Sequence, residues 1–96
     1  MPIAYLVVES NISDPEAFKH YMAASPEVVR AFGGEYLVRG GKVEVLEGDW
    51  TPDRIVVLKF PSFAAAQAFS ASAEYTKARA ARQGAALMRM VVVEGV

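Results

Sequence analysis

The sequence contains no cysteine and a single histidine, His20, among its 96 residues. The lack of cysteine excludes a disulfide framework, a thiolate zinc site and a cysteine nucleophile, and one histidine leaves few ligands for a transition metal. Ten lysines and arginines nearly balance eleven aspartates and glutamates, so the surplus of positive charge typical of nucleic-acid-binding proteins is missing. The longest apolar run, residues 3–8, is far shorter than the roughly 18 residues of a membrane-spanning helix, and no basic segment precedes it. We therefore expect a cytoplasmic protein without a bound cofactor, a nucleic-acid partner or a membrane partner.

The composition predicts one folded domain over residues 1–96. Hydrophobic residues make up 53% of the chain and charged residues 22%, which excludes a disordered chain. A single hydrophobic core usually serves about 50 to 200 residues, so a chain of this length has no material for a second core. We expect that one core to hold the whole fold together.

The first third of the chain predicts a strand and a helix. Residues 3–8 are rich in β-branched and aromatic residues and apolar at both alternating sets of positions, as in a strand that is covered on both faces, so we expect a strand over residues 3–10. Ser13 is the expected N-cap of the helix, with a proline in the first turn and Glu16 completing a capping box. Pro26 predicts a kink or a brief break of this helix near residue 25, and the glycine pair 33–34 ends the helix.

Two alternating stretches come next, residues 35–39 and residues 42–47, on either side of the glycine pair 40–41. They form either a tight hairpin or one long strand with a glycine bulge, and we favour the hairpin. Residues 48–53 are turn formers, so we expect a loop there before a further strand over residues 54–60.

The remainder predicts a second helix and a closing strand. Ser62 is the expected cap of an alanine-rich helix, which is interrupted near residues 72–74. The helical pattern resumes over residues 75–83 and ends at Gly84, and residues 88–94 have the pattern of a strand.

This order of elements predicts an α+β fold of the ferredoxin-like split βαβ type, with one antiparallel sheet and both helices on one face. Three of the strands nevertheless have apolar residues on both faces. If ten such side chains stayed in water at about 1.5 kcal/mol each, the fold would forgo roughly 15 kcal/mol, as much as the stability of a small domain. A second copy is the simplest cover, so we expect a homodimer through the sheet face.

Several runs of the sequence resemble the domain-of-unknown-function family 1330. The runs are Leu37-Val38-Arg39-Gly40-Gly41-Lys42-Val43-Glu44-Val45-Leu46-Glu47-Gly48-Asp49-Trp50, Arg54, Phe60-Pro61-Ser62-Phe63, Ser72-Ala73-Glu74-Tyr75, Ala78-Arg79, Arg82-Gln83-Gly84-Ala85-Ala86 and Val92-Val93-Glu94-Gly95-Val96. The resemblance implies a ferredoxin-like fold that pairs into a dimeric α/β barrel, a group that includes cofactor-free monooxygenases, muconolactone isomerases and haem enzymes. The family usually has proline where this chain has Ala73, which changes only how rigidly the second helix is interrupted. The family has no established reaction, so the resemblance carries little information about function.

A first candidate site lies on the second helix, where Tyr75, Arg79 and Arg82 fall at positions i, i+4 and i+7. One helical stripe would then present a phenol and two guanidinium groups, which suit a carboxylate or a phosphate. The alternative is that both arginines are solvated or pair with acids such as Glu74.

A second group of candidates, Arg39, Trp50 and Arg54, lies at strand ends around the central glycines and loop. Binding residues concentrate at such positions on rigid folds. Trp50 is either a lid over a pocket or a contact to a partner subunit, and we favour the contact. The two arginines have alternative partners in Glu44 and Glu47.

His20 and Tyr21 are the remaining candidates, for acid–base chemistry. Adjacent helical residues point about 100 degrees apart, so the two do not share a face. His20 falls on a mostly polar stripe and is expected at the surface, whereas Tyr21 falls on the core stripe and is the better pocket residue.

Two functions fit these features. The first is a homodimer that binds a small acidic or carbonyl-bearing molecule, with cofactor-independent isomerase or oxygenase chemistry as an extension. In that chemistry Arg79, Arg39 or Arg54 would stabilise an anion, and Tyr75, Tyr21 or His20 would move a proton. The second is a non-catalytic dimerisation or accessory domain. A haem-binding variant is a third interpretation, with His20 as its axial ligand.

Overall fold

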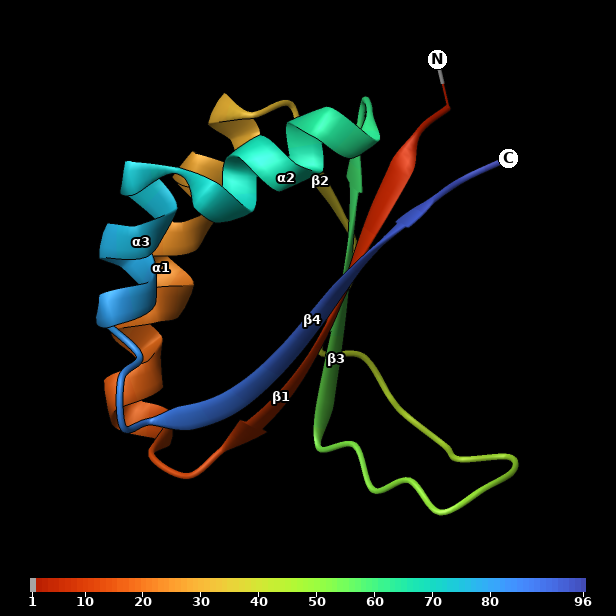
Figure 1. Cartoon of the computed structure of the whole chain (residues 1–96). Helices are drawn as coiled ribbons and strands as arrows, with labels where there is room; N and C mark the ends of the chain where they lie inside the picture. The colour runs from red at the N-terminus through yellow and green to blue at the C-terminus, as the bar shows by residue number, and fades with distance from the viewer. Residues whose placement is uncertain (1) are drawn as a thin grey trace.

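The computed structural model describes residues 2–96 as one four-stranded antiparallel sheet with its helices on one face (Figure 1). The strand order is β2-β3-β1-β4, which confirms the predicted α+β ferredoxin-like arrangement. The elements in chain order are β1 (Ala4–Ile12), α1 (Pro15–Ala31), β2 (Glu35–Arg39), β3 (Arg54–Phe60), α2 (Phe63–Ala71), α3 (Ala73–Ala80) and β4 (Ala86–Glu94).

Strand β1 lies in the middle of the sheet and has apolar residues on both faces. It pairs with β3 and with β4, and its alternate residues Leu6 and Val8 point toward the helices, where both are buried. Val7 points the other way, between Val57 and Val91 on the neighbouring strands. β1 ends two residues later than predicted and β4 begins two residues earlier, because the two strands pair along their full lengths.

The start of α1 differs from the prediction by one residue. The N-cap is Asp14 and not Ser13. The Asp14 carboxylate accepts a hydrogen bond from the amide of Ala17. The Ser13 hydroxyl donates to the carbonyl of Ala85 instead, which attaches the start of the helix to the approach to β4. The helix also runs unbroken through Pro26, so the expected break is absent.

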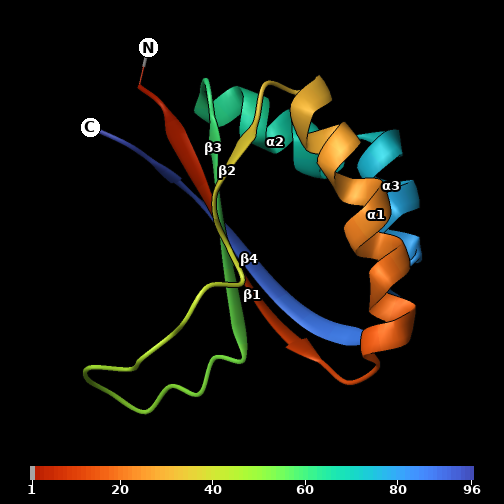
Figure 2. The same ribbon diagram turned by 180° about the vertical axis from the view of Figure 1, so that it is seen from behind.

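The second strand of the predicted hairpin, over residues 42–47, does not form. Residues 41–53, which we call the arm, have no regular structure and project from the sheet on the side away from the helices (Figures 1 and 2). Strand β2 pairs with β3 instead, and Gly40, at φ 73°, turns the chain out of the sheet. The apolar side chains of residues 43–46 find no core here, and Leu46 is 89% exposed.

The interruption of the second helix is confirmed. Ser72 has an extended backbone between α2 and α3, and its hydroxyl accepts from the amide of Tyr75. Ser62 caps α2 as predicted. The last helix ends at Ala80 and not at residue 83, because the chain enters a series of turns that Gly84 closes at φ 81°.

The sheet face away from the helices carries no helix of the described residues (Figure 1), although Trp50 of the arm lies against Glu9 on it. Leu87, Val91 and Val93 all point to this outer face and are more than half exposed. Within residues 2–96, none of the helices has the length and apolar character that crossing a membrane requires.

Candidate functional site

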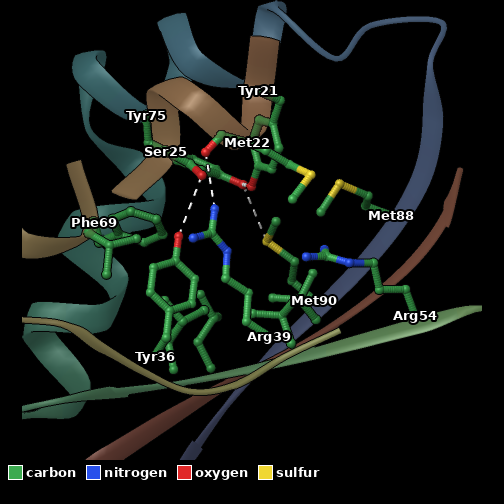
Figure 3. A pocket seen from close by; sticks show the side chains of 15 residues that line it. Tyr21, Met22, Ser25, Tyr36, Arg39, Arg54, Phe69, Tyr75, Met88 and Met90 are labelled. Atoms are coloured by element: carbon green, nitrogen blue, oxygen red, sulfur yellow. Dashed lines mark hydrogen bonds between the residues drawn. The ribbon is translucent and has the colours of Figure 1, made fainter. Parts of the chain in front are cut away.

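A cavity lies between the inner face of the sheet and helix α1, close to α3 (Figure 3). The space open to the centre of a water molecule is about 30 Å³, room for about two waters. Its walls are mostly apolar, and its polar groups come from a small set of side chains. The lining residues are Leu6, Val8, Tyr21, Met22, Ser25, Val29, Tyr36, Arg39, Arg54, Val56, Leu58, Phe69, Tyr75, Met88 and Met90.

Two tyrosines meet in the cavity. Tyr21 from α1 and Tyr75 from α3 share a hydrogen bond of 2.6 Å between their hydroxyl oxygens. Tyr75 is fully buried, and its hydroxyl also lies 3.9 Å from the sulfur of Met90. Burial, followed by the neighbouring Tyr75, raises the pKa of Tyr21 well above its usual value. The Tyr21 phenol is therefore neutral at pH 7, where it acts as a hydrogen-bond donor or acceptor and not as a phenolate base.

Two arginines reach the same cavity from the sheet. The Arg39 guanidinium lies 4.5 Å from the ring centre of Tyr36 and donates to the carbonyl of Met22 over 3.0 Å. The Arg54 guanidinium lies 6.0 Å from the ring centre of Phe18. Burial, with the charge of Arg39 as the next cause, lowers the pKa of Arg54. The lowered pKa does not remove the positive charge of Arg54 at neutral pH, because a guanidinium group stays protonated in proteins.

The two cations have no acidic partner. The ion pairs within residues 2–96 are Lys19–Glu16 and Arg89–Glu9, and neither touches the cavity arginines. The pairs that the sequence suggested, between Arg39 or Arg54 and the glutamates at 44 and 47, are absent from this set because the arm leaves the sheet. Among residues 2–96, no carboxylate lines the cavity. The site therefore combines two unpaired guanidinium groups with phenol hydroxyls and apolar walls.

The predicted stripe of Tyr75, Arg79 and Arg82 is only partly brought together. Arg79 lies over the Tyr75 ring at 4.8 Å and donates to the carbonyl of Ser70, and Arg82 lies over the Tyr21 ring at 5.2 Å. Neither arginine lines the cavity. Arg82 leaves the stripe because α3 ends at Ala80, so helical spacing no longer applies to it. In the described part of the chain neither arginine pairs with Glu74 either.

Trp50 and His20 lie elsewhere. Trp50 is on the outer face of the sheet, where its indole N–H donates to Glu9 over 2.8 Å, so it is not a lid over this cavity. The Trp50 and Arg89 hydrogen bonds lower the pKa of Glu9. His20 is exposed on α1, as predicted, and does not line the cavity.

The family assignment rests on a match over nearly the whole chain. Residues 3–96 match the model of a domain of unknown function, DUF1330. The chain belongs to this family. The resemblance carried by the sequence runs is thus confirmed, and no curated protein matches the chain.

Solved structures agree on the fold of this DUF1330 protein. A protein of unknown function from Rhodopseudomonas palustris is 22% identical, with 99% of this chain and 83% of that chain covered and a TM-score of 0.75. A dimeric ferredoxin-like protein of unknown function from Thermobifida fusca is 11% identical, with coverages of 97% and 91% and a TM-score of 0.64. A protein from Nitrosomonas europaea, named as a candidate antibiotic biosynthesis monooxygenase, is 13% identical, with coverages of 100% and 93% and a TM-score of 0.56. At these identities the likeness shows the fold alone.

Sequence reasoning missed Tyr36 and Ser25 as cavity residues of this DUF1330 protein. Tyr36 and Arg39 are three residues apart and would point to opposite faces of a regular strand. A bulge between Tyr36 and Val38 shifts the register, so Tyr36 pairs with Leu58 and Arg39 with Val56, both on the inner face. No signal in the sequence locates that bulge. Ser25, by contrast, falls on the core side of α1 between Tyr21 and Val29, and its helical spacing from them could have identified it.

The side chains of this DUF1330 protein that could bind a metal ion are dispersed over residues 2–96. Across residues 2–96, no three histidine, aspartate or glutamate side chains gather as a metal site would require. The polar groups that line the cavity are hydroxyls and guanidinium groups, which suit an organic anion better than a cation.

Proposed function

We propose that the protein binds a small acidic molecule in the cavity between the sheet and α1. The observation that carries the proposal is the presence of Arg39 and Arg54 in one cavity that no carboxylate lines. Arg54 is half-buried without a counter-charge, which is costly, and a bound anion removes that cost. Arg39 is exposed and adds a second positive charge. Planar guanidinium groups also match the geometry of a carboxylate.

The other lining groups define the rest of the ligand. Met88 and Met90 provide flexible apolar surface for a hydrocarbon body. The Tyr21 and Tyr75 hydroxyls offer hydrogen bonds to a carbonyl or hydroxyl group farther in. A ligand larger than a few atoms displaces side chains at the opening, because the present free volume holds only about two waters. We therefore favour a small carboxylate with an apolar body and a second oxygen function.

Cofactor-independent catalysis is a natural extension of this site. A carbonyl oxygen that accepts from the tyrosine pair gains stronger hydrogen bonds when negative charge develops on it. Tyr75 and Tyr21 are the candidate catalytic groups, with Arg39 and Arg54 as anion stabilisers. Arg79 and Arg82 act through the tyrosine rings on which they lie. His20 has no place in this chemistry, because it lies outside the cavity.

Titration with benzoate, followed by NMR chemical shifts, tests the binding proposal, with benzyl alcohol as the uncharged analogue. We expect benzoate to shift the resonances of the lining residues and to bind about tenfold to a hundredfold more tightly than benzyl alcohol, as charge-assisted hydrogen bonds predict. Arg54→Met should remove this preference, whereas Arg30→Met, an exposed arginine at the end of α1, should keep it. Equal affinity for the two probes would overturn the proposal.

The second candidate function is a dimerisation domain without a ligand. The observation that favours it is the small free volume of the cavity, about 30 Å³. Absence of binding by any small carboxylate, with a stable dimer, would establish this alternative.

We also infer that two copies pair through the outer face of the sheet. The exposed Leu87, Val91 and Val93 support this interface, because burying them recovers part of the hydrophobic free energy that the uncovered face forgoes. The dimeric state named for the Thermobifida fusca neighbour supports the same assembly. In that dimer Trp50, which lies on the outer face, would contact the partner subunit.

A further inference from the structure

The carbonyl of Met22 lacks the regular donor of an α-helix. In an α-helix each carbonyl accepts from the amide four residues later, which for Met22 is residue 26. That residue is Pro26, which has no amide hydrogen to donate, and α1 nevertheless runs unbroken through it. Pro26 thus leaves the Met22 carbonyl without its regular helical donor, at a residue that lines the cavity.

Arg39 occupies this acceptor. Its Nη2 donates to the Met22 carbonyl oxygen over 3.0 Å, from the end of strand β2 to the middle of α1. The ring of Tyr36 supports the guanidinium from the other side, with 4.5 Å between the guanidinium carbon and the ring centre. Figure 3 shows the two side chains rising together from the sheet toward α1.

Tyr36, whose ring supports Arg39, also contacts α1 beside Pro26. The Tyr36 hydroxyl lies 3.5 Å from the hydroxyl of Ser25, the residue directly before Pro26. Arg39 itself is exposed and has no ion-pair partner within residues 2–96. A long, exposed arginine normally loses much rotamer freedom when it binds a ligand. Held by the Met22 carbonyl and the Tyr36 ring, Arg39 has already lost that freedom.

We propose that Pro26 is a positioning residue of the anion site: by leaving the Met22 carbonyl free, it fixes the Arg39 guanidinium beside the cavity. This inference rests on the proposed binding of a small acidic molecule. A guanidinium has five N–H donors, so one hydrogen bond to Met22 leaves four for a ligand carboxylate. Proline thus serves the site through what it lacks, and its own side chain need not touch the ligand.

Pro26→Ala tests the proposal because it restores the amide at position 26, which then competes with Arg39 for the Met22 carbonyl. We expect the variant to bind benzoate about threefold to tenfold more weakly, the cost of immobilising one long side chain upon binding. It should also unfold at higher denaturant concentration, since alanine is favourable in a helix interior and proline is not. Weaker binding by a more stable protein is not what a merely structural role of Pro26 predicts.

A double-mutant cycle with Arg39→Met isolates the coupling. In the Arg39→Met background, Pro26→Ala should leave the affinity for benzoate unchanged, because the group that it positions is gone. In the background of the control variant Arg30→Met, Pro26→Ala should retain its full effect. An equal effect of Pro26→Ala with and without Arg39 would overturn the proposal.

A measurement on the ligand-free protein separates this inference from the proposed function. The carbonyl ¹³C resonance of Met22 should move on Arg39→Met in the wild-type background and move much less in the Pro26→Ala background. If it does not respond to Arg39→Met, the anchoring of Arg39 is refuted, whatever benzoate does. If it responds as expected while benzoate fails to bind, the anchor stands, and the proposed function fails together with the role of Pro26 in it.

Discussion

Removing one hydroxyl of the buried tyrosine pair should cost nearly as much stability as removing both. Tyr75 is fully buried and Tyr21 is 9% exposed, and their oxygens are 2.6 Å apart. Tyr75→Phe removes a hydrogen bond worth about 1 kcal/mol net and strands the Tyr21 hydroxyl, which costs about 1–3 kcal/mol in a dry site. Because Tyr21 lines the cavity, a water can partly replace its partner. We therefore expect a loss of about 1–2 kcal/mol in the free energy of unfolding.

The double variant Tyr21→Phe/Tyr75→Phe strands no hydroxyl at this contact. Its loss should be close to that of one single variant, which leaves a coupling energy of about 1–2 kcal/mol between the two hydroxyls. Urea unfolding followed by far-UV circular dichroism measures all three losses, and for a chain of this length 1 kcal/mol corresponds to about 4–8 °C in Tm.

Tyr5→Phe is the matched control for these variants. The Tyr5 hydroxyl has no hydrogen-bond partner within residues 2–96, so its removal should change the stability by less than about 0.5 kcal/mol. Additive losses in the double variant would refute the reasoning, because they would mean that each hydroxyl is stabilised independently of the other.

Three further predictions concern pH, assembly and the outer face. The pKa of Tyr21 is higher in the folded protein than in the unfolded chain. The stability that this difference contributes is therefore complete below the unfolded pKa of about 10, and it declines above that pH by up to about 1.4 kcal/mol per pH unit. Tyr21→Phe should flatten this alkaline decline, as measured by urea unfolding at several pH values. Val91→Glu should raise the dissociation constant of the proposed dimer about a hundredfold in analytical ultracentrifugation, because about 1.5 kcal/mol is lost on each of the two copies. Ala24→Glu, at an exposed position of α1, should leave the dimer unchanged. A dimer that Val91→Glu does not weaken would place the interface elsewhere. The fluorescence of Trp50, the single tryptophan, should change on acidification when the Glu9 carboxylate takes up a proton, at a pH below the usual pKa of glutamate. Glu9→Gln should abolish that transition.

The order and type of the elements could be predicted because they depend on local patterns. Alternating and helical spacings located the four strands and the helices, and Ser62 and Ser72 marked helix boundaries that the structure confirms. Predictions that depended on tertiary partners were less successful. Ser13 is not the N-cap because the Ala85 carbonyl takes its hydroxyl, and residues 42–47 form no strand because they leave the sheet.

For the candidate site too, predictions from local patterns succeeded and predictions that depended on tertiary packing did not. Tyr21 was correctly assigned to the core side of its helix, and Arg39 and Arg54 do reach one cavity. The assignment of Arg82 to a shared stripe with Tyr75 assumed a helix that continues to residue 83, whereas α3 ends at Ala80. The last turn of a helix depends on its tertiary neighbours as well as on its own residues, so spacing alone could not decide this point.

Local sequence patterns were enough to predict the α+β class and the apolar outer face of the sheet, because composition, periodicity and caps act within a few residues of one another. The resemblance to the family was carried by particular runs of residues. The set of side chains that share the site was settled by packing alone. Tyr21 and Tyr75 meet across 54 residues of chain, and the bulge in β2 places Arg39 opposite the carbonyl that Pro26 leaves free. Such meetings depend on the rotation of each helix and the register of each strand, which are set when the elements pack together.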